Sequence, residues 1–329
     1  MIRIIDSISD AGAFMTGRCA RNVSGAEYHQ PVLLDEVVAL LNPAPGKSLV
    51  DGTLGGGGHS EAFLTAGASV IGLDQDPEAL NFAGNRLAGF GGRFQAVHAN
   101  FSELDDVLDR LGIEEIDGGL LDLGVSSWQL DTAERGFSFM KDGPLDMRMN
   151  PLISVSAADI VNNASEEQLA RIFYNFGEEQ GSRRIAARLV RDRMRHPFKT
   201  TLELAASVES VIPRRGRTHP ATKVFQALRI AVNRELESLA EGLEQFTRRL
   251  RSGGRLGVIT FHSLEDRMVK TFFKARSMEF LDRPEWPAPR PNPDFMFRLV
   301  KTKPVVAGED EQLKNPRSRS AKLRVVEKI

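Results

Sequence analysis

Three acidic residues, each following a short apolar run, are the first candidates for chemistry in this sequence. They are Asp51, Asp74 and Asp122, and the runs before them cover 48–50, 69–73 and 117–121. In an open α/β sheet, parallel strands end at one edge, and ligands bind in the crevice outside that edge. A carboxylate can accept hydrogen bonds from two hydroxyls. Three carboxylates there suit a ligand with hydroxyls, an exocyclic amine and a sulfonium, and no phosphate.

A glycine-rich turn, 52–58, follows the first apolar run. Glycine takes φ > 0 without a Cβ penalty and lets the backbone approach a ligand, although such turns are about as often purely structural. The dinucleotide fingerprint G-x-G-x-x-G fits poorly, because with Gly55 and Gly57 as its first two positions the third falls on Ser60. The spacing of Asp51, Gly55 and Gly57 instead resembles the first motif of S-adenosylmethionine (SAM) methyltransferases.

Composition sets broad limits on the protein. The chain has 329 residues, 41% hydrophobic and 26% charged, enough for a full core and two domains. The net charge of −1 neither requires nor excludes a nucleic-acid partner. The single cysteine, Cys19, excludes an internal disulfide and fits a reducing cytoplasm. No apolar run approaches the ~18 residues of a membrane span, so we expect a cytoplasmic protein. No metal-ligand cluster stands out, so we name no metal-ligating residue, and the metal requirement stays open.

Strand and helix patterns alternate up to about residue 124, which predicts an α/β fold with a parallel, doubly wound sheet. The alternation then stops, and only helical patterns recur until about 229. We interpret that stretch as an all-α substrate domain inserted after the fourth strand. The predicted organisation is a flexible extension at 1–26, a sheet domain at 27–124 and 230–329, and a helical insert at 125–229, with a fifth strand at 253–261 and a late antiparallel hairpin formed by 298–306 and 322–329.

The segment from 123 to 149 is dense in polar, aromatic and glycine residues without a clean period. A long irregular segment after a strand end is commonly functional, although it can also be a simple connector between domains. Its aromatic residues Trp128, Phe137 and Phe139 could stack on an extruded base or belong to a core.

Several separate motifs, in one order along the chain, closely resemble the RsmH (MraW) family of bacterial 16S ribosomal RNA cytosine-N4 methyltransferases. The resemblance runs from about His29 to the C-terminus and leaves out only the first ~25 residues. The motifs are Asp51-Gly52-Thr53, Gly57-Gly58-His59-Ser60, 121–127, 134–139, 143–149, His219-Pro220-Ala221-Thr222, 225–227 and 261–267.

This resemblance implies a class I SAM-dependent methyltransferase sheet with an inserted helical substrate domain, and SAM as methyl donor. It implies a target cytidine in the decoding centre of 16S rRNA in the small (30S) ribosomal subunit. The positions that match the family's SAM contacts are Gly57, Gly58, His59, Asp74, Phe101, Asp122 and Gln129. Asp74 would bind the ribose hydroxyls and Phe101 would pack on the adenine.

Asp122 and His262 are the catalytic candidates. Many amino-methyltransferases place a D/N-P-P-Y tetrad after the fourth strand, but here Asp122 is followed by 123–125, Leu-Gly-Val. Asp122 could therefore serve the cofactor, the target amine, or both. Most of the rate should come from aligning nitrogen, methyl and sulfur, with the proton leaving later. His262 and Asp266 follow strand five, although His262 is as often structural in such a place, and His59 is expected to cap the glycine turn.

Basic residues gather in the predicted helical insert. Residues 181–230 contain 12 Lys/Arg and three acids. We expect a helix at 183–195 with Ile185, Leu189 and Met194 on its apolar face. The candidate RNA-binding residues are Arg184, Arg188, Arg191 and Arg195 on the other face, with Arg214 and Arg215 further along; a second basic run comprises Lys314, Arg317, Arg319, Lys322 and Arg324. Such stripes neutralise phosphates.

Two other functions stay open on the residues alone. One is a SAM methyltransferase with a non-RNA substrate, although the large basic insert disfavours a small molecule. The other is a non-catalytic ribosome-assembly factor, which three intact strand-end acids disfavour. The sequence leaves the oligomeric state open, a homodimer included.

Overall fold

The computed structural model describes residues 31–214, 216 and 219–329, so the expected extension at 1–26 lies outside the described residues. The chain divides into two compact units. We call Met1–Gly124 with Leu239–Ile329 the sheet unit, and Val125–Ser238 the helical unit. The predicted second boundary, 229/230, falls inside a helix that the helical unit retains. No helix in the described part of the chain is long and apolar enough to cross a membrane.

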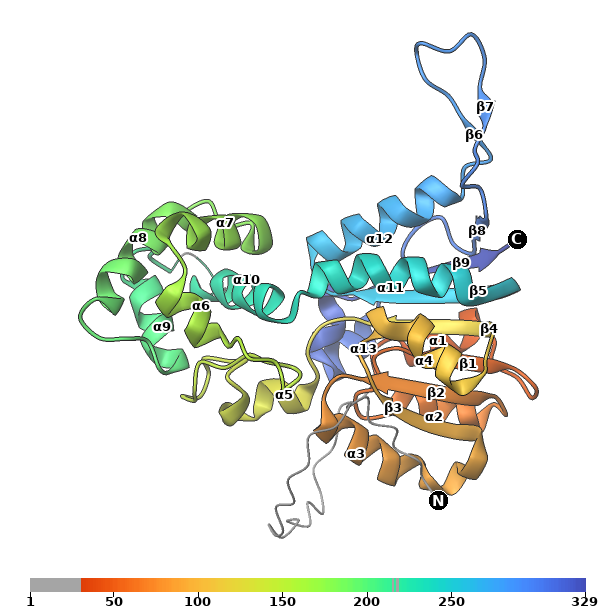
Figure 1. Cartoon of the computed structure of the whole chain (residues 1–329), viewed down its shortest axis with the longest axis horizontal. Helices are drawn as coiled ribbons and strands as arrows, with labels where there is room; N and C mark the ends of the chain where they lie inside the picture. The colour runs from red at the N-terminus through yellow and green to blue at the C-terminus, as the bar shows by residue number, and fades with distance from the viewer. Residues whose placement is uncertain (1–30, 215, 217–218) are drawn as a thin grey trace. The chain divides into compact units, whose positions relative to one another are not determined.

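The sheet unit contains a seven-stranded sheet with helices on both faces (Figure 1). Its strands are β1 (Ser48–Asp51), β2 (Ser69–Asp74), β3 (Phe94–His98), β4 (Ile116–Asp122), β5 (Leu250–Thr260), β8 (Phe297–Leu299) and β9 (Lys322–Lys328), and their order is β3-β2-β1-β4-β5-β9-β8. The first five are parallel, whereas β9 is antiparallel to both β5 and β8. The predicted doubly wound sheet is therefore confirmed.

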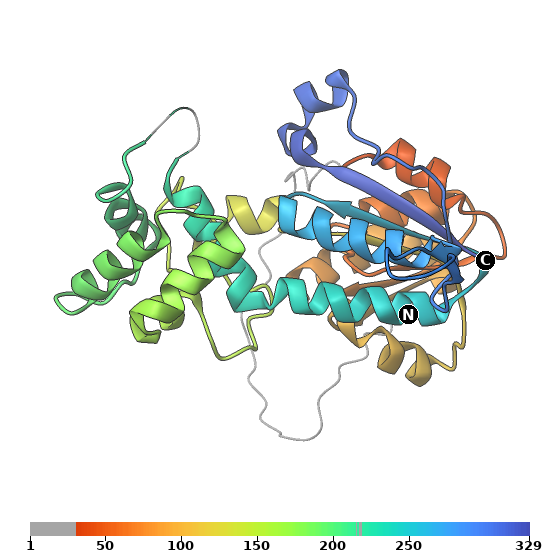
Figure 2. The ribbon, with the colours of Figure 1, turned by 90° about the horizontal axis from the view of Figure 1, so that it is seen from above.

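Two hydrophobic clusters cover the two faces of this sheet. One face packs against α1 (Leu34–Leu41), α2 (Gly58–Thr65) and α3 (Pro77–Leu87). The other packs against α4 (Leu104–Leu111), α11 (Glu235–Arg249) and α12 (Ser263–Arg276). Successive strand residues point to opposite faces, so Leu49 and Val50 of β1 enter different clusters. Figure 2 shows α11 and α12 side by side along the sheet.

The helical unit is built from helices that share one core. They are α5 (Ser127–Asp131), α6 (Ala157–Asn163), α7 (Glu166–Gly177), α8 (Ser182–Arg193), α9 (Thr201–Glu209) and α10 (Ala221–Asn233). Ser156, Ser165 and Thr200 open α6, α7 and α9 with reciprocal capping boxes. Helices α7 and α10 cross closely, because a Cβ on Gly177 would lie 2.6 Å from the Lys223 carbonyl oxygen. The predicted all-α character of this stretch is confirmed for its described residues.

Several predicted element limits were wrong. The helix predicted for 183–195 ends at Arg193, so Arg195 lies beyond it, and Met194 is 83% exposed and not on the apolar face. The antiparallel pairing of the two late strands is confirmed, but the first is only β8 and not 298–306. The residues between β8 and β9 instead include α13 (Glu309–Lys314) and a 3₁₀ turn, η4 (Pro316–Ser320).

Candidate active site at the carboxyl edge of the sheet

Strand order places the three acids singled out in the sequence side by side. Strands β2, β1 and β4 are neighbours and parallel, and they end in Asp74, Asp51 and Asp122 respectively. All three carboxylates therefore lie at the same edge of the sheet, where ligands of open α/β folds bind. This edge belongs entirely to the sheet unit.

Asp51 stabilises the glycine-rich turn from within. Its carboxylate accepts a hydrogen bond of 2.7 Å from the Ser60 hydroxyl and one of 3.2 Å from the Thr53 amide. Burial raises the pKa of Asp51 to about 6, against the effect of those two bonds. Because both oxygens are engaged and the side chain is 1% exposed, we assign Asp51 a structural role.

The turn itself needs glycine at two positions. Gly57 is the N-cap of α2 with φ 76°, a conformation that favours glycine. A Cβ on Gly58 would lie only 2.4 Å from Cγ of Pro31. These two residues lead directly into the first turn of α2, where backbone amides have no partner within the helix itself.

Asp74 holds the other side of the turn. Its carboxylate accepts the amide of Gly55 at 2.8 Å and the amide of Asp76 at 2.9 Å. Burial raises the pKa of Asp74 to about 6, and the neighbouring charges of Asp76 and Asp51 add to that increase. The carboxylate therefore links two loops at the edge of the sheet.

Of the three strand-end carboxylates, Asp122 has the fewest hydrogen bonds. Its Oδ1 is buried and has no hydrogen-bond partner among the described residues. Burial, with the charges of Asp51 and Glu265, raises its pKa to about 8, although Arg317 lowers it. A buried acceptor without a donor is costly. A ligand that brings a donor or a positive charge to this oxygen would remove that cost.

Two residues that act on Asp122 have roles that were not recognised from the sequence. The Thr53 hydroxyl accepts the amide of Asp122 at 2.6 Å, so the first motif sets the position of the fourth strand's end. Arg317 in η4 acts on the Asp122 carboxylate through its charge. The sequence placed Arg317 only in a basic run, because its spatial neighbour is almost two hundred residues away.

His59 is a buried, neutral histidine. Its Nε2 lies 3.0 Å from the carbonyl oxygen of Val32, so that nitrogen carries the proton and donates. Burial lowers the pKa of His59 to about 4. Its Nδ1 lies 3.8 Å from the Asp122 carboxylate, too long for a hydrogen bond. The ring thus ties α2 to the segment before α1 and borders the Asp122 carboxylate.

Phe101 follows β3 and begins a 3₁₀ turn, η2 (Phe101–Glu103), that Asn100 caps. Its ring packs against α11, because a Cβ on Gly242 would lie 2.6 Å from the Phe101 ring. A Cβ on Gly52 would lie 3.0 Å from the Phe101 Cβ. Phe101 is therefore half-buried beside the glycine-rich turn, within the sheet unit.

Gln129, the remaining predicted SAM contact, belongs to the helical unit. Gln129 is buried. Its side-chain oxygen accepts the backbone amide of Ser126 at 3.0 Å, and the Ser126 hydroxyl accepts the backbone amide of Gln129 at 3.2 Å. This capping box opens α5. The spacing of Ser126 and Gln129, S-x-x-Q, is the sequence signature of such a box, which was not used in predicting the role of Gln129.

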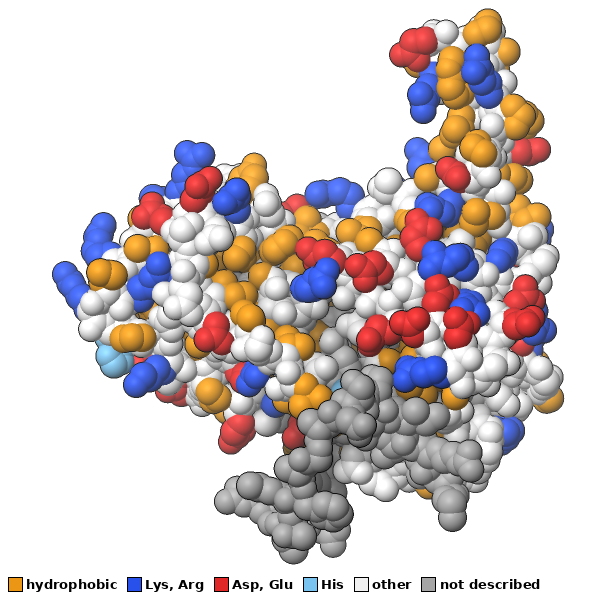
Figure 3. Space-filling model, in the orientation of Figure 1, with side chains coloured by type: hydrophobic (Ala, Val, Ile, Leu, Met, Phe, Trp, Pro, Cys, Tyr) orange, Lys and Arg blue, Asp and Glu red, His pale blue; other side chains and the backbone are white. Residues whose placement is uncertain are grey.

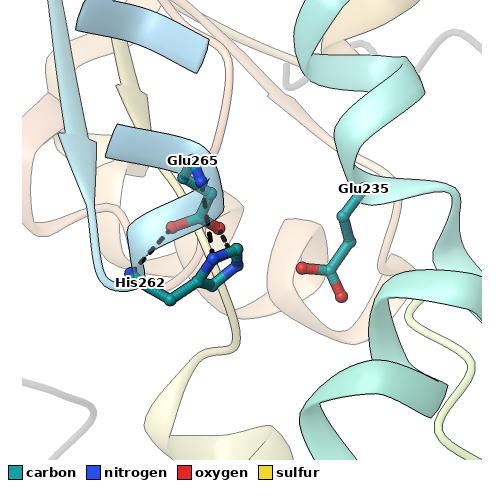
Figure 4. Close-up of side chains that lie close together, drawn as sticks. All are labelled: Glu235, His262 and Glu265. Carbon is teal, nitrogen blue, oxygen red and sulfur yellow. Dashed lines mark hydrogen bonds and ion pairs between the residues drawn. The ribbon is translucent and has the colours of Figure 1, made fainter. Parts of the chain in front are cut away.

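His262 caps α12, with Glu265 as the reciprocal partner (Figure 4). The His262 ring lies 3.0 Å from the Glu265 carboxylate, which also accepts the Phe261 amide at 2.8 Å. Asp266, the other candidate after strand five, pairs with Lys322 at 3.0 Å and Arg324 at 2.8 Å, and the hydrogen bonds from both lower its pKa despite partial burial. The second basic run is therefore partly neutralised.

The irregular segment after Gly124 is folded onto the helical unit's core. Phe137 is buried in that core, and the Phe139 ring lies 4.8 Å from those of Phe225 and His219. A guanidinium nitrogen of Arg135 donates to the carbonyl oxygens of Arg148 and Met149 at 3.1 and 3.0 Å. For Phe137 and Phe139, the structure therefore supports the core interpretation.

The predicted RNA-binding arginines differ in their surroundings. Arg184 and Arg191 are exposed on α8, opposite its buried residues Ile185 and Leu189. Arg188 forms an ion pair of 2.7 Å with Asp192. Arg195 is exposed beyond the helix end and Arg214 is exposed further along, whereas Arg215 lies outside the described residues.

Comparison with known proteins identifies the family of this chain. The model of the MraW methylase family matches residues 26–329. A protein named "Ribosomal RNA small subunit methyltransferase H" from Geobacter sulfurreducens is 52% identical over 307 residues, which cover 92% of this chain and 99% of that protein. Its namesake from Carboxydothermus hydrogenoformans is 49% identical over 304 residues, 92% of this chain and 98% of that protein. The chain therefore belongs to the MraW methylase family, and the resemblance seen in its motifs is confirmed.

Proposed function

We propose that this protein transfers the methyl group of SAM to N4 of a cytidine in the 16S rRNA of the small ribosomal subunit. Its family membership and the names of its relatives support the reaction class and the RNA substrate. The observation that carries the chemistry is the buried Asp122 oxygen without a partner, at the strand edge where ligands of this fold class bind.

The charges at this edge fit SAM. Burial accounts for most of the increase in the pKa values of Asp51, Asp74 and Asp122, and the charge of Asp51 adds to it for the other two. The sulfonium and ammonium of SAM would stabilise the ionised carboxylates. We assign the ribose hydroxyls to Asp74, the adenine to Phe101, and the methionine part to the amides after Gly57. Gln129 stays a predicted SAM contact from the sequence motifs.

The acceptor chemistry calls for orientation more than for a strong base. The lone pair of cytosine N4 is delocalised into the ring, so the amine is a weak nucleophile. SAM supplies an electrophilic methyl group, and the new N–C bond forms as the S–C bond breaks. Asp122 Oδ1 would accept an N–H hydrogen bond from N4, hold the amine in line, and take or relay the proton that nitrogen then releases.

His262 has a positioning role in this scheme. Its ring and the Glu265 carboxylate close the N-terminus of α12, and Glu265 is one of the charges that raise the Asp122 pKa. Glu265 therefore acts on Asp122 through its charge, and His262 holds Glu265 at the start of α12 without being assigned to the substrate.

We assign RNA binding to the helical unit, through the exposed guanidinium groups of Arg184 and Arg191, with Arg195 and Arg214 as further contacts. The substrate is 16S rRNA within the 30S particle, and the site of action is the cytoplasm. A face of exposed arginines can bind phosphates of structured RNA without reading its sequence.

The test is methyl transfer from labelled SAM to small subunits isolated from cells that lack the activity, followed by digestion of the RNA and identification of the modified nucleoside. We expect N4-methylcytidine. Label in a ribosomal protein, or in another nucleoside, would contradict the proposal, and so would SAM binding without transfer to any small-subunit component.

A further inference from the structure

The loop between β6 (Phe280–Leu281) and β7 (Arg290–Pro291) extends away from the rest of the sheet unit (Figure 1). We call residues 280–291 the arm. The two strands pair only with each other, through Phe280 with Pro291 and Leu281 with Arg290. Two pairs are too few for a hairpin that is stable by itself, so the arm's order must come from elsewhere.

The base of the arm is anchored to the end of α12. The Asn292 side-chain amide donates to the carbonyl oxygens of Ala275 and Met278 at 2.8 and 2.7 Å. The Asn292 backbone amide donates to the Glu279 carbonyl at 2.9 Å. Asn292 is 7% exposed, so these bonds are shielded from water. Proline at 284, 287, 289 and 291 further restricts the backbone.

The far part of the arm is organised around Trp286. The guanidinium carbon of Arg283 lies 4.9 Å from the indole centroid, and that of Arg290 lies 4.8 Å from it. Such distances give a favourable cation–π interaction. Trp286 is half-buried and both arginines are exposed, so the indole holds two guanidinium groups at the surface. Figure 3 shows basic and hydrophobic side chains together on this projection.

The two arginines do not neutralise the nearest acids. Asp282 and Glu285 are close in sequence, yet neither Arg283 nor Arg290 forms an ion pair with any residue in the described ranges. Other arginines of the same unit do: Arg248 and Arg249 pair with Asp105, and Arg255 pairs with Glu327. The arm therefore keeps two guanidinium groups available for an external anion.

We propose that the arm binds the substrate's ribosomal RNA away from the methylated nucleotide, with Arg283 and Arg290 bound to backbone phosphates. A guanidinium whose face rests on an indole still presents its N–H edge, which matches two phosphate oxygens. Phe280, 53% exposed at the base of the arm, adds an apolar surface on which an unpaired base can stack. This inference rests on the proposed function, because it takes small-subunit RNA as the substrate.

The arm carries as many acids as bases, so its contribution should be local rather than long-range. Ordered guanidinium groups lose little freedom on binding. Removing two phosphate contacts should make binding less dependent on salt. The slope of log affinity against log salt should become shallower by about 1.5.

The test compares three variants of the full-length protein on small subunits. R283A/R290A should raise KM for the subunits roughly tenfold and leave the affinity for SAM unchanged. W286A should also raise KM for the subunits, because the two arginines lose the ring on which they rest. W286F keeps an aromatic ring there and should bring KM most of the way back to the wild-type value. K301A/K303A removes the same charge from exposed lysines of the same unit and should have a smaller effect.

A photo-crosslinking benzophenone residue at position 280 identifies the partner directly. Crosslinks to 16S rRNA support the proposal, whereas crosslinks only to a ribosomal protein or to a second copy of this chain would overturn it. An R283A/R290A variant as active as the wild type, or no more impaired than K301A/K303A, would also overturn it. Failure of the proposed function is distinct, because the wild type itself would then transfer no methyl group to RNA.

Discussion

The carboxyl edge of the sheet and the basic face of α8 both carry charged side chains, but in contrasting environments. At the sheet edge, Asp51 and Asp74 are bound by backbone amides, and Asp122 is buried without a partner for Oδ1. On α8, Arg184 and Arg191 are exposed. Buried charges interact strongly with a ligand and with one another, whereas exposed charges are screened. The first region should therefore control chemistry and the second affinity and its salt dependence.

The largest effect should come from Asp122. D122N keeps the size of the side chain but removes the carboxylate that orients the amine and accepts a proton, so kcat should fall by roughly 10²-fold or more. Single-turnover methylation of small subunits measures that step. D117N, at the opposite end of β4, is the matched control. A kcat within twofold of the wild type would remove Asp122 from the chemistry.

The next effect should be on SAM affinity. Removing the Asp74 carboxylate costs charged hydrogen bonds to the ribose, about 2–3 kcal/mol or roughly 30- to 150-fold in Kd. Because Asp74 also accepts two backbone amides, D74A could disturb the turn, and D74N is the cleaner change. Calorimetry measures the Kd, with circular dichroism as the control for folding. Unchanged affinity in D74N would place the ribose elsewhere.

A smaller effect is expected on α8. R184A/R191A removes two exposed charges and should lower the salt dependence of RNA binding by about 1.5 in the log–log slope, without changing SAM affinity. Arg188 is less suitable because its ion pair with Asp192 also links α8 to Ser207. R171A on α7, which removes a charge already paired with Glu167, is the control. Equal slopes for all proteins would show that the α8 face does not contact RNA.

The smallest expected effect is on stability. Here D122N should improve on the wild type, whereas the same variant lowers kcat. The pKa of Asp122 is raised to about 8 in the folded state, so ionisation of this carboxyl opposes folding. The resulting destabilisation is absent below the ordinary carboxyl range and complete above pH 8. D122N should therefore have a higher free energy of unfolding than the wild type at pH 9 and the same free energy of unfolding at pH 4. Denaturant melts across this pH range check it. A pH-independent difference would mean that Asp122 is not buried as a charged group.

How far the sequence could be interpreted also differs between the two regions. The three strand-end acids were predictable because each directly follows an apolar run, and parallel strands bring those ends together. The basic face was predicted less well: Arg195 lies beyond α8 and Met194 is exposed, because α8 ends at Arg193. That end depends on tertiary contacts, since Arg193 donates to the carbonyl oxygens of Val161 and Ala164 at 2.7 Å.

Other features could not be read from local pattern at all. The hydroxyl of Thr53 and the charge of Arg317 act on Asp122 across 69 and 195 residues of sequence, so neither role has a local signature. His262 is not among the usual N-cap residues, so its capping of α12 is revealed only by the structure, whereas the S-x-x-Q spacing that ends at Gln129 is a local signal of a capping box. For Thr53, Arg317 and His262 the residue type was noticed, but the partner is fixed by the fold.

One kinetic measurement tests the division of labour between the two regions most directly. KM for SAM and KM for small subunits would be determined in parallel for the wild type, D74N and R184A/R191A. We expect D74N to raise only KM for SAM and R184A/R191A to raise only KM for the subunits. A D74N variant with normal KM for SAM, or an R184A/R191A variant impaired only toward SAM, would contradict the assignment of donor and RNA to these two surfaces.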